Sequence, residues 1–186
     1  MDKFFGNLNA VLGVGFLLAV GLMFAPHFFD RDVALSAAQW VHVWFGILWI
    51  GLLYYFNFVQ IPTMPLVPAE LKPGVSKYIA PKALFYFRWG ALFTVLSGLV
   101  LAYEWHELRE ALTLSGDARL IGVGMYLALI MAANVWFIIW PNQKKALGIV
   151  EADADTKAKA AKTAMIASRI NTMLSLPMLL CMVSMH

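Results

Sequence analysis

Residues 37–59 read AAQWVHVWFGILWIGLLYYFNFV, and no Asp, Glu, Lys or Arg interrupts them. An α-helix needs about 20 such residues to cross a hydrocarbon core about 30 Å thick. Apolar stretches of similar length occur at residues 8–26, 84–103, 120–140 and 164–185. The sequence therefore predicts an all-α integral membrane protein, with about five transmembrane helices bundled into one domain over residues 1–186.

The overall composition supports the same class. Hydrophobic residues make up 61% of the chain, charged residues only 13%, and the mean hydropathy is +0.72. A soluble domain of this length carries far more polar surface, so the lipid bilayer is the expected partner. The net charge of +3 comes from basic residues in loops beside apolar stretches, and we therefore expect no nucleic-acid partner.

The cysteine count and the start of the chain indicate which covalent modifications to expect. The single cysteine, Cys181, lies inside the last apolar stretch, which excludes a disulfide framework and a C-x-x-C-H motif for covalent haem attachment. The first stretch has the charged start of a signal peptide, but its apolar run is long and Met23 stands where a cleavage site needs a small residue. We therefore expect residues 8–26 to remain as a helix.

The distribution of Lys and Arg predicts the orientation. If the chain starts in the cytoplasm, eleven of the 14 basic residues lie on that side, and Arg31, Arg109 and Arg119 lie on the other. Cytoplasmic loops normally carry this excess. The sequence predicts a multi-pass protein of the bacterial cytoplasmic (inner) membrane, with a cytoplasmic N-terminus and a periplasmic C-terminus.

In this orientation His27, His42, His106 and His186 all fall on the outer side, and only His42 lies well inside a span. Gly46 and Trp49 continue the helical face of His42, and a residue without a side chain lets a flat macrocycle lie against the helix. We therefore interpret His42 as an axial ligand of b-type haem. The alternative is that His42 anchors the helix at the headgroup level while Gly46 packs against a neighbouring helix.

A second ligand is expected from the same side of the membrane. His186 ends the last span there and is the predicted partner of His42 as a metal ligand, with His106 as the substitute. Arg31, Arg109 and Arg119 are the cations available on that side to meet haem propionates.

Two further sets of residues leave alternatives open. Copper is not the expected metal, because methionines on a membrane helix usually serve packing, although soft ligands gather near His186. These ligands are Met173, Met178, Cys181, Met182 and Met185.

The inner half carries a second polar group, whose arginines either snorkel to the interface or pair with a carboxylate, a haem propionate or a quinone carbonyl. Its members are Asn57, Gln60, Arg88, Asn134, Arg169 and Asn171.

The connecting segments carry little chemistry of their own. Five prolines within residues 61–81 predict a kinked inner loop. Residues 142–162 are expected to extend the last helix into the cytoplasm as a turn or two. Gly122 and Gly124 predict a close-packing surface between helices rather than a nucleotide motif.

Several blocks of residues together resemble the membrane domain of the bacterial membrane-bound urate hydroxylase family, also called the urate oxidase N-terminal domain. The blocks are residues 40–51, 87–89, 94–98, 131–136, 141–144 and 171–177, followed by Ser184 and His186. The resemblance implies a helical oxidoreductase domain that feeds electrons toward a cytochrome c, with His42 and His186 as motif histidines. The run from Arg169 to Pro177 is also loosely similar to the small haem-dependent protoporphyrinogen oxidases.

Longer members of the urate hydroxylase family continue into a cytochrome c domain, so this chain resembles a short form. The resemblance then implies a separate cytochrome c or a respiratory-type membrane complex as the electron partner, and a homo-oligomer is an open alternative. We expect a membrane-embedded, b-type haem-binding redox protein that transfers electrons on the outer side. The alternatives are an oxidoreductase acting on urate or another small substrate, and a non-redox structural or assembly subunit.

Overall fold

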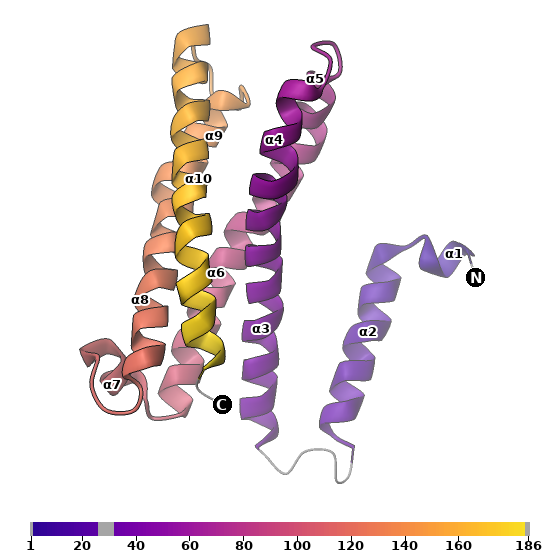
Figure 1. The fold of residues 1–186 in the computed structure, drawn as a ribbon. Coiled ribbons are helices and arrows are strands. Elements are labelled where there is room, and N and C mark those ends of the chain that lie inside the picture. The colour runs from indigo at the N-terminus through magenta and orange to yellow at the C-terminus, as the bar shows by residue number, and fades with distance from the viewer. Residues whose placement is uncertain (1, 26–31, 185–186) are drawn as a thin grey trace.

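The computed structural model describes residues 2–25 and 32–184, and every regular element in these ranges is a helix (Figure 1). Four helices in this part of the chain are long and apolar enough to cross a membrane, and they run alternately up and down. They cover Val33–Leu66, Lys72–Glu104, Arg119–Ala146 and Ala154–Val183. This confirms the predicted all-α membrane class.

The long helices are composite. Val33–Leu66 contains α3 (Val33–Tyr54), the π-helical η1 (Tyr55–Gln60), α4 (Ile61–Thr63) and the 3-10 turn η2 (Met64–Leu66). Lys72–Glu104 contains α5 (Lys72–Gly74), the π-helical η3 (Val75–Ile79) and α6 (Ala80–Glu104). Arg119–Ala146 contains α8 (Arg119–Ala133), the π-helical η4 (Asn134–Ile139) and α9 (Trp140–Ala146). The fourth is α10 (Ala154–Val183), and α7 (Leu108–Thr113) connects the second helix to the third.

Prolines explain the π-helical segments and correct one prediction. Within the described ranges, each π-helical segment ends two residues before a proline, at Pro62, Pro81 and Pro141. A proline ring clashes with the carbonyl four residues earlier, and a widened turn relieves that clash while the helix continues. The kinked loop predicted for residues 61–81 is therefore wrong for most of that segment, and only residues 67–71 leave the helix.

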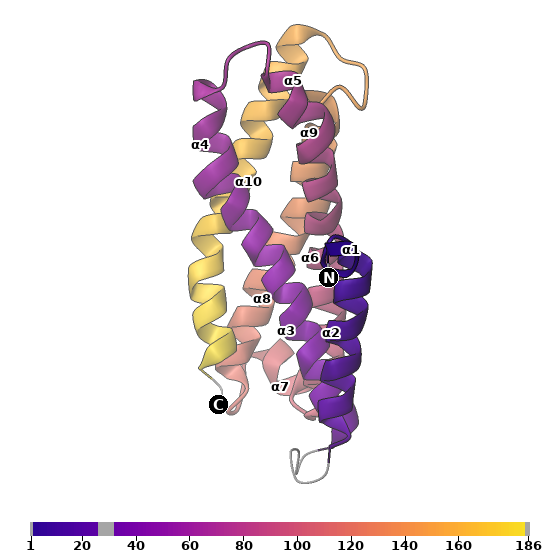
Figure 2. The same ribbon diagram turned by 90° about the vertical axis from the view of Figure 1, so that its right-hand side faces the viewer.

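The first apolar stretch is set apart from the bundle. Its helix α2 (Leu8–Met23) has 16 residues and no buried side chain, and the short α1 (Asp2–Phe5) precedes it. Figures 1 and 2 show α2 beside the lower half of α3, where the rings of Phe16 and Trp40 lie 5.7 Å apart. Because α2 is shorter than the other apolar helices, the fifth span remains a prediction, as does the orientation.

The bundle interior is filled by large apolar side chains from the long helices. Trp49, Leu53, Phe87, Met131 and Val135 are fully buried. Exposed apolar side chains cover the outside of the same helices, among them Ile47 on α3, Phe137 on η4 and Leu180 on α10. This arrangement, with apolar groups on both the inside and the outside, suits a bundle surrounded by lipid.

The last helix begins before its apolar part, but the predicted extension over residues 142–162 holds only from Ala154 onward, because residues 142–146 belong to α9. Asp153 caps α10, because its carboxylate accepts hydrogen bonds from the Thr156 hydroxyl at 2.6 Å and the Thr156 amide at 2.8 Å. These bonds, the hydroxyl bond first, lower the pKa of Asp153. The charged first turns of α10 thus extend the helix beyond the predicted start at residue 164.

Gly122 and Gly124 form the predicted close-packing surface. A Cβ at Gly122 would collide with the backbone carbonyl of Ala111 in α7, and one at Gly124 would lie 2.8 Å from the Cβ of Cys181 in α10. Both glycines therefore allow α8 to approach its neighbours more closely than any residue with a side chain would.

Gly124→Leu is expected to destabilise the protein by about 1–3 kcal/mol, because the added atoms overpack the contact between α8 and α10. Thermal unfolding in detergent measures the change. Gly13→Leu in α2 is the matched control, since a Cβ there meets nothing within 4 Å. Equal melting temperatures for the two variants would contradict close packing at Gly124.

Candidate functional site

The imidazole of His42 is held by α6. Its Nδ1 lies 3.0 Å from the backbone oxygen of Thr94 and 3.2 Å from the Ser97 hydroxyl oxygen. The Thr94 carbonyl can only accept, and the Ser97 hydroxyl donates its own proton to the Phe93 carbonyl at 2.6 Å. Nδ1 therefore carries the proton, and the lone pair of Nε2 is left for another partner. Histidines that bind metals commonly have this arrangement.

Gly98 makes room for the ring. A Cβ at Gly98 would lie 2.9 Å from Cε1 of His42, so only glycine lets α6 pack against the imidazole. Gly46 was the glycine that the sequence predicted to leave room beside His42. A Cβ at Gly46 would meet only Cγ2 of Thr94, at 3.8 Å. Gly46 is thus open on the cavity side, while Gly98 provides the space in which the His42 imidazole packs. The small and hydroxyl residues at 94, 97 and 98 share one helical face, which is the sequence signal for this contact.

A cavity of about 510 Å³ lies beside His42 between α3, α6, α8 and α10. Its volume falls in the range of about 300–1,000 Å³ that small molecules and cofactors occupy. His42, Gly46 and Trp49, three of the predicted site residues, all line it. Most of the lining is apolar, and its polar side chains include Gln39, Thr94, Tyr54 and Glu107.

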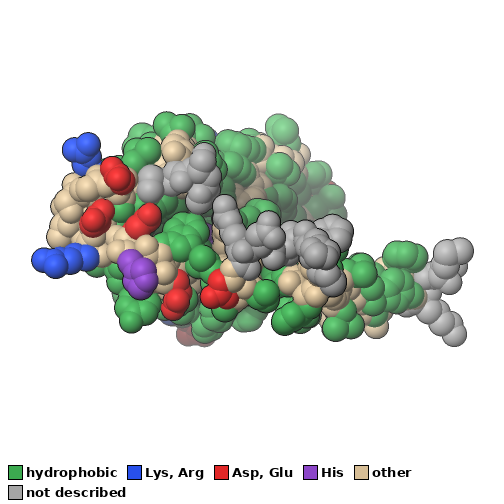
Figure 3. All heavy atoms as spheres, turned by 90° about the horizontal axis from the view of Figure 1, so that it is seen from below, with side chains coloured by type: hydrophobic (Ala, Val, Ile, Leu, Met, Phe, Trp, Pro, Cys, Tyr) green, Lys and Arg blue, Asp and Glu red, His purple; other side chains and the backbone are tan. Residues whose placement is uncertain are grey.

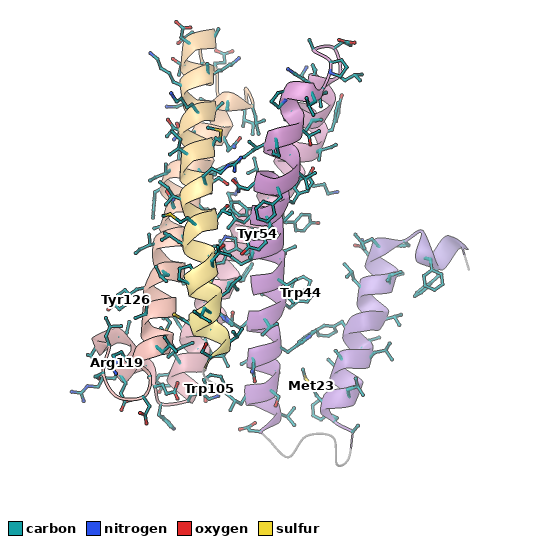
Figure 4. All side chains as sticks on the ribbon, viewed as in Figure 1. Met23, Trp44, Tyr54, Trp105, Arg119 and Tyr126 are labelled. Carbon is teal, nitrogen blue, oxygen red and sulfur yellow. The ribbon has the colours of Figure 1, made fainter. Side chains whose placement is uncertain are left out.

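Two polar groups of the cavity wall differ in how they are satisfied. The Tyr54 hydroxyl lies 3.0 Å from the Ser175 hydroxyl, so α3 and α10 are joined at this level (Figure 4). The indole nitrogen of Trp49 is buried and has no hydrogen-bond partner. A buried N–H donor without an acceptor is a group that a bound molecule could satisfy.

The C-terminal end of α10 completes the wall. Met178, Leu179, Met182 and Val183 line the cavity, so two of the five soft ligands near the end of the chain face it together. Cys181 is buried instead against Gly124 of α8. His186 lies outside the described residues, as do His27 and Arg31.

Other predicted site residues do not line the cavity, although Trp105 and Glu107, the chain neighbours of His106, do. His106 is exposed, with φ 60°, in the turn after α6, and Arg109 is exposed on α7. Arg119 begins α8 on the side that faces away from α3 (Figure 4). Charged side chains gather around this end of the molecule, as Figure 3 shows. No Lys or Arg among the described residues lines the cavity, so the predicted contact of Arg109 and Arg119 with propionates has no support here.

The described part of the chain contains no metal site made only of side chains. Among the described residues no group of three or more His, Cys, Asp or Glu could hold a metal ion. A haem needs only one or two axial ligands from the protein, and His42 can supply one of them.

The three asparagines of the inner polar group, whose roles the sequence left open, cross-link the helices. Asn134 donates to Oδ1 of Asn171 at 2.8 Å, and Asn171 donates to the Met131 carbonyl at 3.0 Å. Asn57 donates to the Ser168 hydroxyl at 2.7 Å. These bonds join η4 and η1 to α10 in the middle of the bundle.

The comparisons with known proteins address the second half of the chain. Residues 103–186 match the family model described as urate oxidase N-terminal. The match agrees with the predicted family and covers somewhat less than half of the chain, so the similarity is to this part of it. The matched part contains α8, α10 and His186, whereas His42 precedes it. Comparison with curated proteins and comparison with solved structures find no match.

Proposed function

We propose that this protein is a membrane-embedded, b-type haem-binding redox protein related to the urate hydroxylase membrane domain, and that it binds haem in the cavity beside His42. The observation that carries this proposal is the imidazole itself. Its Nδ1 proton is committed to the Thr94 carbonyl, and its Nε2 lone pair remains free in a residue that lines an apolar cavity.

The residues present fit such a group. The wall is mostly apolar, Gly46 leaves the helix surface open, and the Trp49 N–H lacks an acceptor. When bound, a haem supplies one-electron redox chemistry. Thr94 and Ser97 would orient the imidazole of His42, and the surrounding apolar side chains would exclude water from the haem.

The second residue that would hold the haem is proposed to be His186, which follows the described end of α10 in the sequence. Two described residues offer an alternative, because the thioethers of Met178 and Met182 come from the α10 side of the same cavity. Met and His together are a known axial pair for haem. His106 does not line the cavity and is the weaker substitute.

The absorption spectrum of the purified, detergent-solubilised protein tests the proposal. A reduced-minus-oxidised spectrum of b type, with about one haem for each chain, is the expected result. A protein that is colourless after expression with ample haem and after reconstitution with added haem would overturn it, and would favour the structural or assembly subunit.

Gly46→Leu is expected to lower the haem content several-fold while His42 is still present, because the leucine side chain would fill the space beside α3. The haem content per chain is measured from the absorbance of the pyridine haemochrome. Val41→Leu is the control, since Val41 lies on α3 but does not line the cavity. Equal haem content in Gly46→Leu and the wild type would contradict a haem on this face.

The family match also favours a second candidate, the oxidation of urate or a similar small substrate with electrons passing to a separate cytochrome c. Addition of urate to the haem-loaded protein, with cytochrome c as acceptor, tests it. Urate-dependent reduction of the cytochrome is the expected sign, and a haem-loaded protein that reduces no cytochrome would leave electron transfer to another partner in a membrane complex or a homo-oligomer.

A further inference from the structure

A cluster of cations and indoles lies where α6 meets η4 and α9. The guanidinium carbon of Arg88 is 3.4 Å from the ring centroid of Trp140 and 5.8 Å from that of Trp136. The ammonium nitrogen of Lys144 is 5.7 Å from the Trp140 ring. We call these four residues the Arg88 cluster. They bring two positive charges to one place against aromatic faces, where cation–π attraction helps to hold them.

The Arg88 cluster is distinct from the haem cavity. Gly98, the residue that packs on His42, follows Arg88 by ten positions in α6, which corresponds to about 15 Å along the helix. None of the four cluster residues lines the cavity. Whatever the cluster binds is therefore not accounted for by the proposed haem.

The unsatisfied atoms of the cluster are all hydrogen-bond donors. Nε and Nη1 of Arg88 and Nε1 of Trp136 are buried without a partner. Within the described ranges, neither Arg88 nor Lys144 has a carboxylate oxygen within 4 Å. Donors and positive charge without an acceptor favour a bound anion, because burying an uncompensated charge is costly.

The height of the cluster in the bundle indicates where the anion comes from. Phe56 contacts Phe87 at 5.6 Å, and the neighbouring Asn57 bonds to Ser168, so Arg88 and Arg169 lie at a similar level. Arg169 is exposed on α10, and tryptophans such as Trp136 and Trp140 are typical of the membrane–water interface. In the orientation predicted from the sequence this level lies toward the cytoplasmic side, where basic pockets between helices commonly bind anionic headgroups.

Simple snorkelling does not account for Arg88. A snorkelling arginine places its guanidinium among water and headgroups, as the exposed Arg169 can. In Arg88 two of the three guanidinium nitrogens are instead buried beside indole rings. We propose that the Arg88 cluster is a binding site for a phosphate group, supplied by an anionic phospholipid of the inner leaflet or by a free phosphate. Phosphate oxygens would accept hydrogen bonds from Arg88 and Trp136, and Lys144 would add charge.

Ligand-dependent thermal stabilisation of the full chain tests this proposal. The protein is delipidated in detergent and titrated separately with phosphatidylglycerol, phosphatidylcholine and inorganic phosphate, and retained lipid is counted by native mass spectrometry. Phosphatidylglycerol is expected to raise the melting temperature at lower concentration than phosphatidylcholine. Arg88→Gln should weaken that apparent affinity about tenfold or more, since a charge-assisted hydrogen bond is lost, and Lys144→Gln should weaken it less.

Arg169→Gln is the matched control, because it removes an exposed arginine at the same level outside the cluster. If Arg88→Gln is unstable, Arg88→Lys and Lys144→Gln still test the site. A response to inorganic phosphate alone that Lys144→Gln weakens would support the site and identify a soluble source. An absence of any response in the wild type, or equal responses in Lys144→Gln, Arg88→Lys and Arg169→Gln, would overturn the proposal.

Discussion

Replacing His42 with alanine is expected to abolish the b-type haem spectrum. Among the described residues His42 is the one histidine that lines the cavity, and its Nδ1 bond to Thr94 leaves Nε2 as a ready ligand. Alanine removes the ligand and leaves the apolar cavity wall otherwise intact, so the haem content should fall to the background of nonspecific binding. The reduced-minus-oxidised spectrum and the haem content per chain measure this loss.

The other histidines provide the controls. His106→Ala should leave the spectrum unchanged, because His106 is exposed in the turn after α6, and His27→Ala should do the same. His186→Ala should convert a six-coordinate low-spin signal into a five-coordinate high-spin one, or abolish it. If His186→Ala has no effect and Met182→Leu produces that change, the second ligand is Met182. Retention of a full spectrum by His42→Ala would show that the haem proposal for this cavity is wrong.

The length of the apolar stretches was sufficient to predict the class of the fold, because the thickness of the bilayer imposes it on any helical membrane protein. The segment 61–81 was wrongly predicted as a loop. A cluster of prolines normally predicts a turn, because proline disrupts the interior of an ordinary α-helix. Here Pro62 and Pro81 each follow a π-helical segment, which lets the helix continue. The sequence shows the prolines but not the widened turns.

The candidate site was predictable only in part from the sequence. His42 stood out because an ionisable residue inside an apolar stretch is a functional suspect by default. Its partners Thr94, Ser97 and Gly98 lie more than 50 residues away, and they are recognised only when the register between α3 and α6 is known. The same holds for Trp136 and Trp140, whose stacking with Arg88 depends on how η4 and α9 pack against α6.

The asparagine pair in the bundle centre is expected to contribute strongly to stability. Asn171 is fully buried, accepts from Asn134 at 2.8 Å and donates to the Met131 carbonyl at 3.0 Å. Asn171→Leu should lower the free energy of unfolding by about 1–3 kcal/mol, because the Asn134 amide loses an acceptor in an apolar surrounding. Its remaining bond, to the Ala167 carbonyl, is longer at 3.2 Å. Thermal or detergent-induced unfolding measures the loss.

The double variant Asn134→Leu/Asn171→Leu separates a paired interaction from simple crowding. If the two amides stabilise the bundle as a pair, the double variant should lose less stability than the sum of the single variants, since no unpaired amide remains. Asn142→Leu is the control, because the side chain of Asn142 bonds within its own long helix, Arg119–Ala146, to the Ile138 carbonyl. Strictly additive losses would contradict coupling between Asn134 and Asn171, and would assign their effect to packing alone.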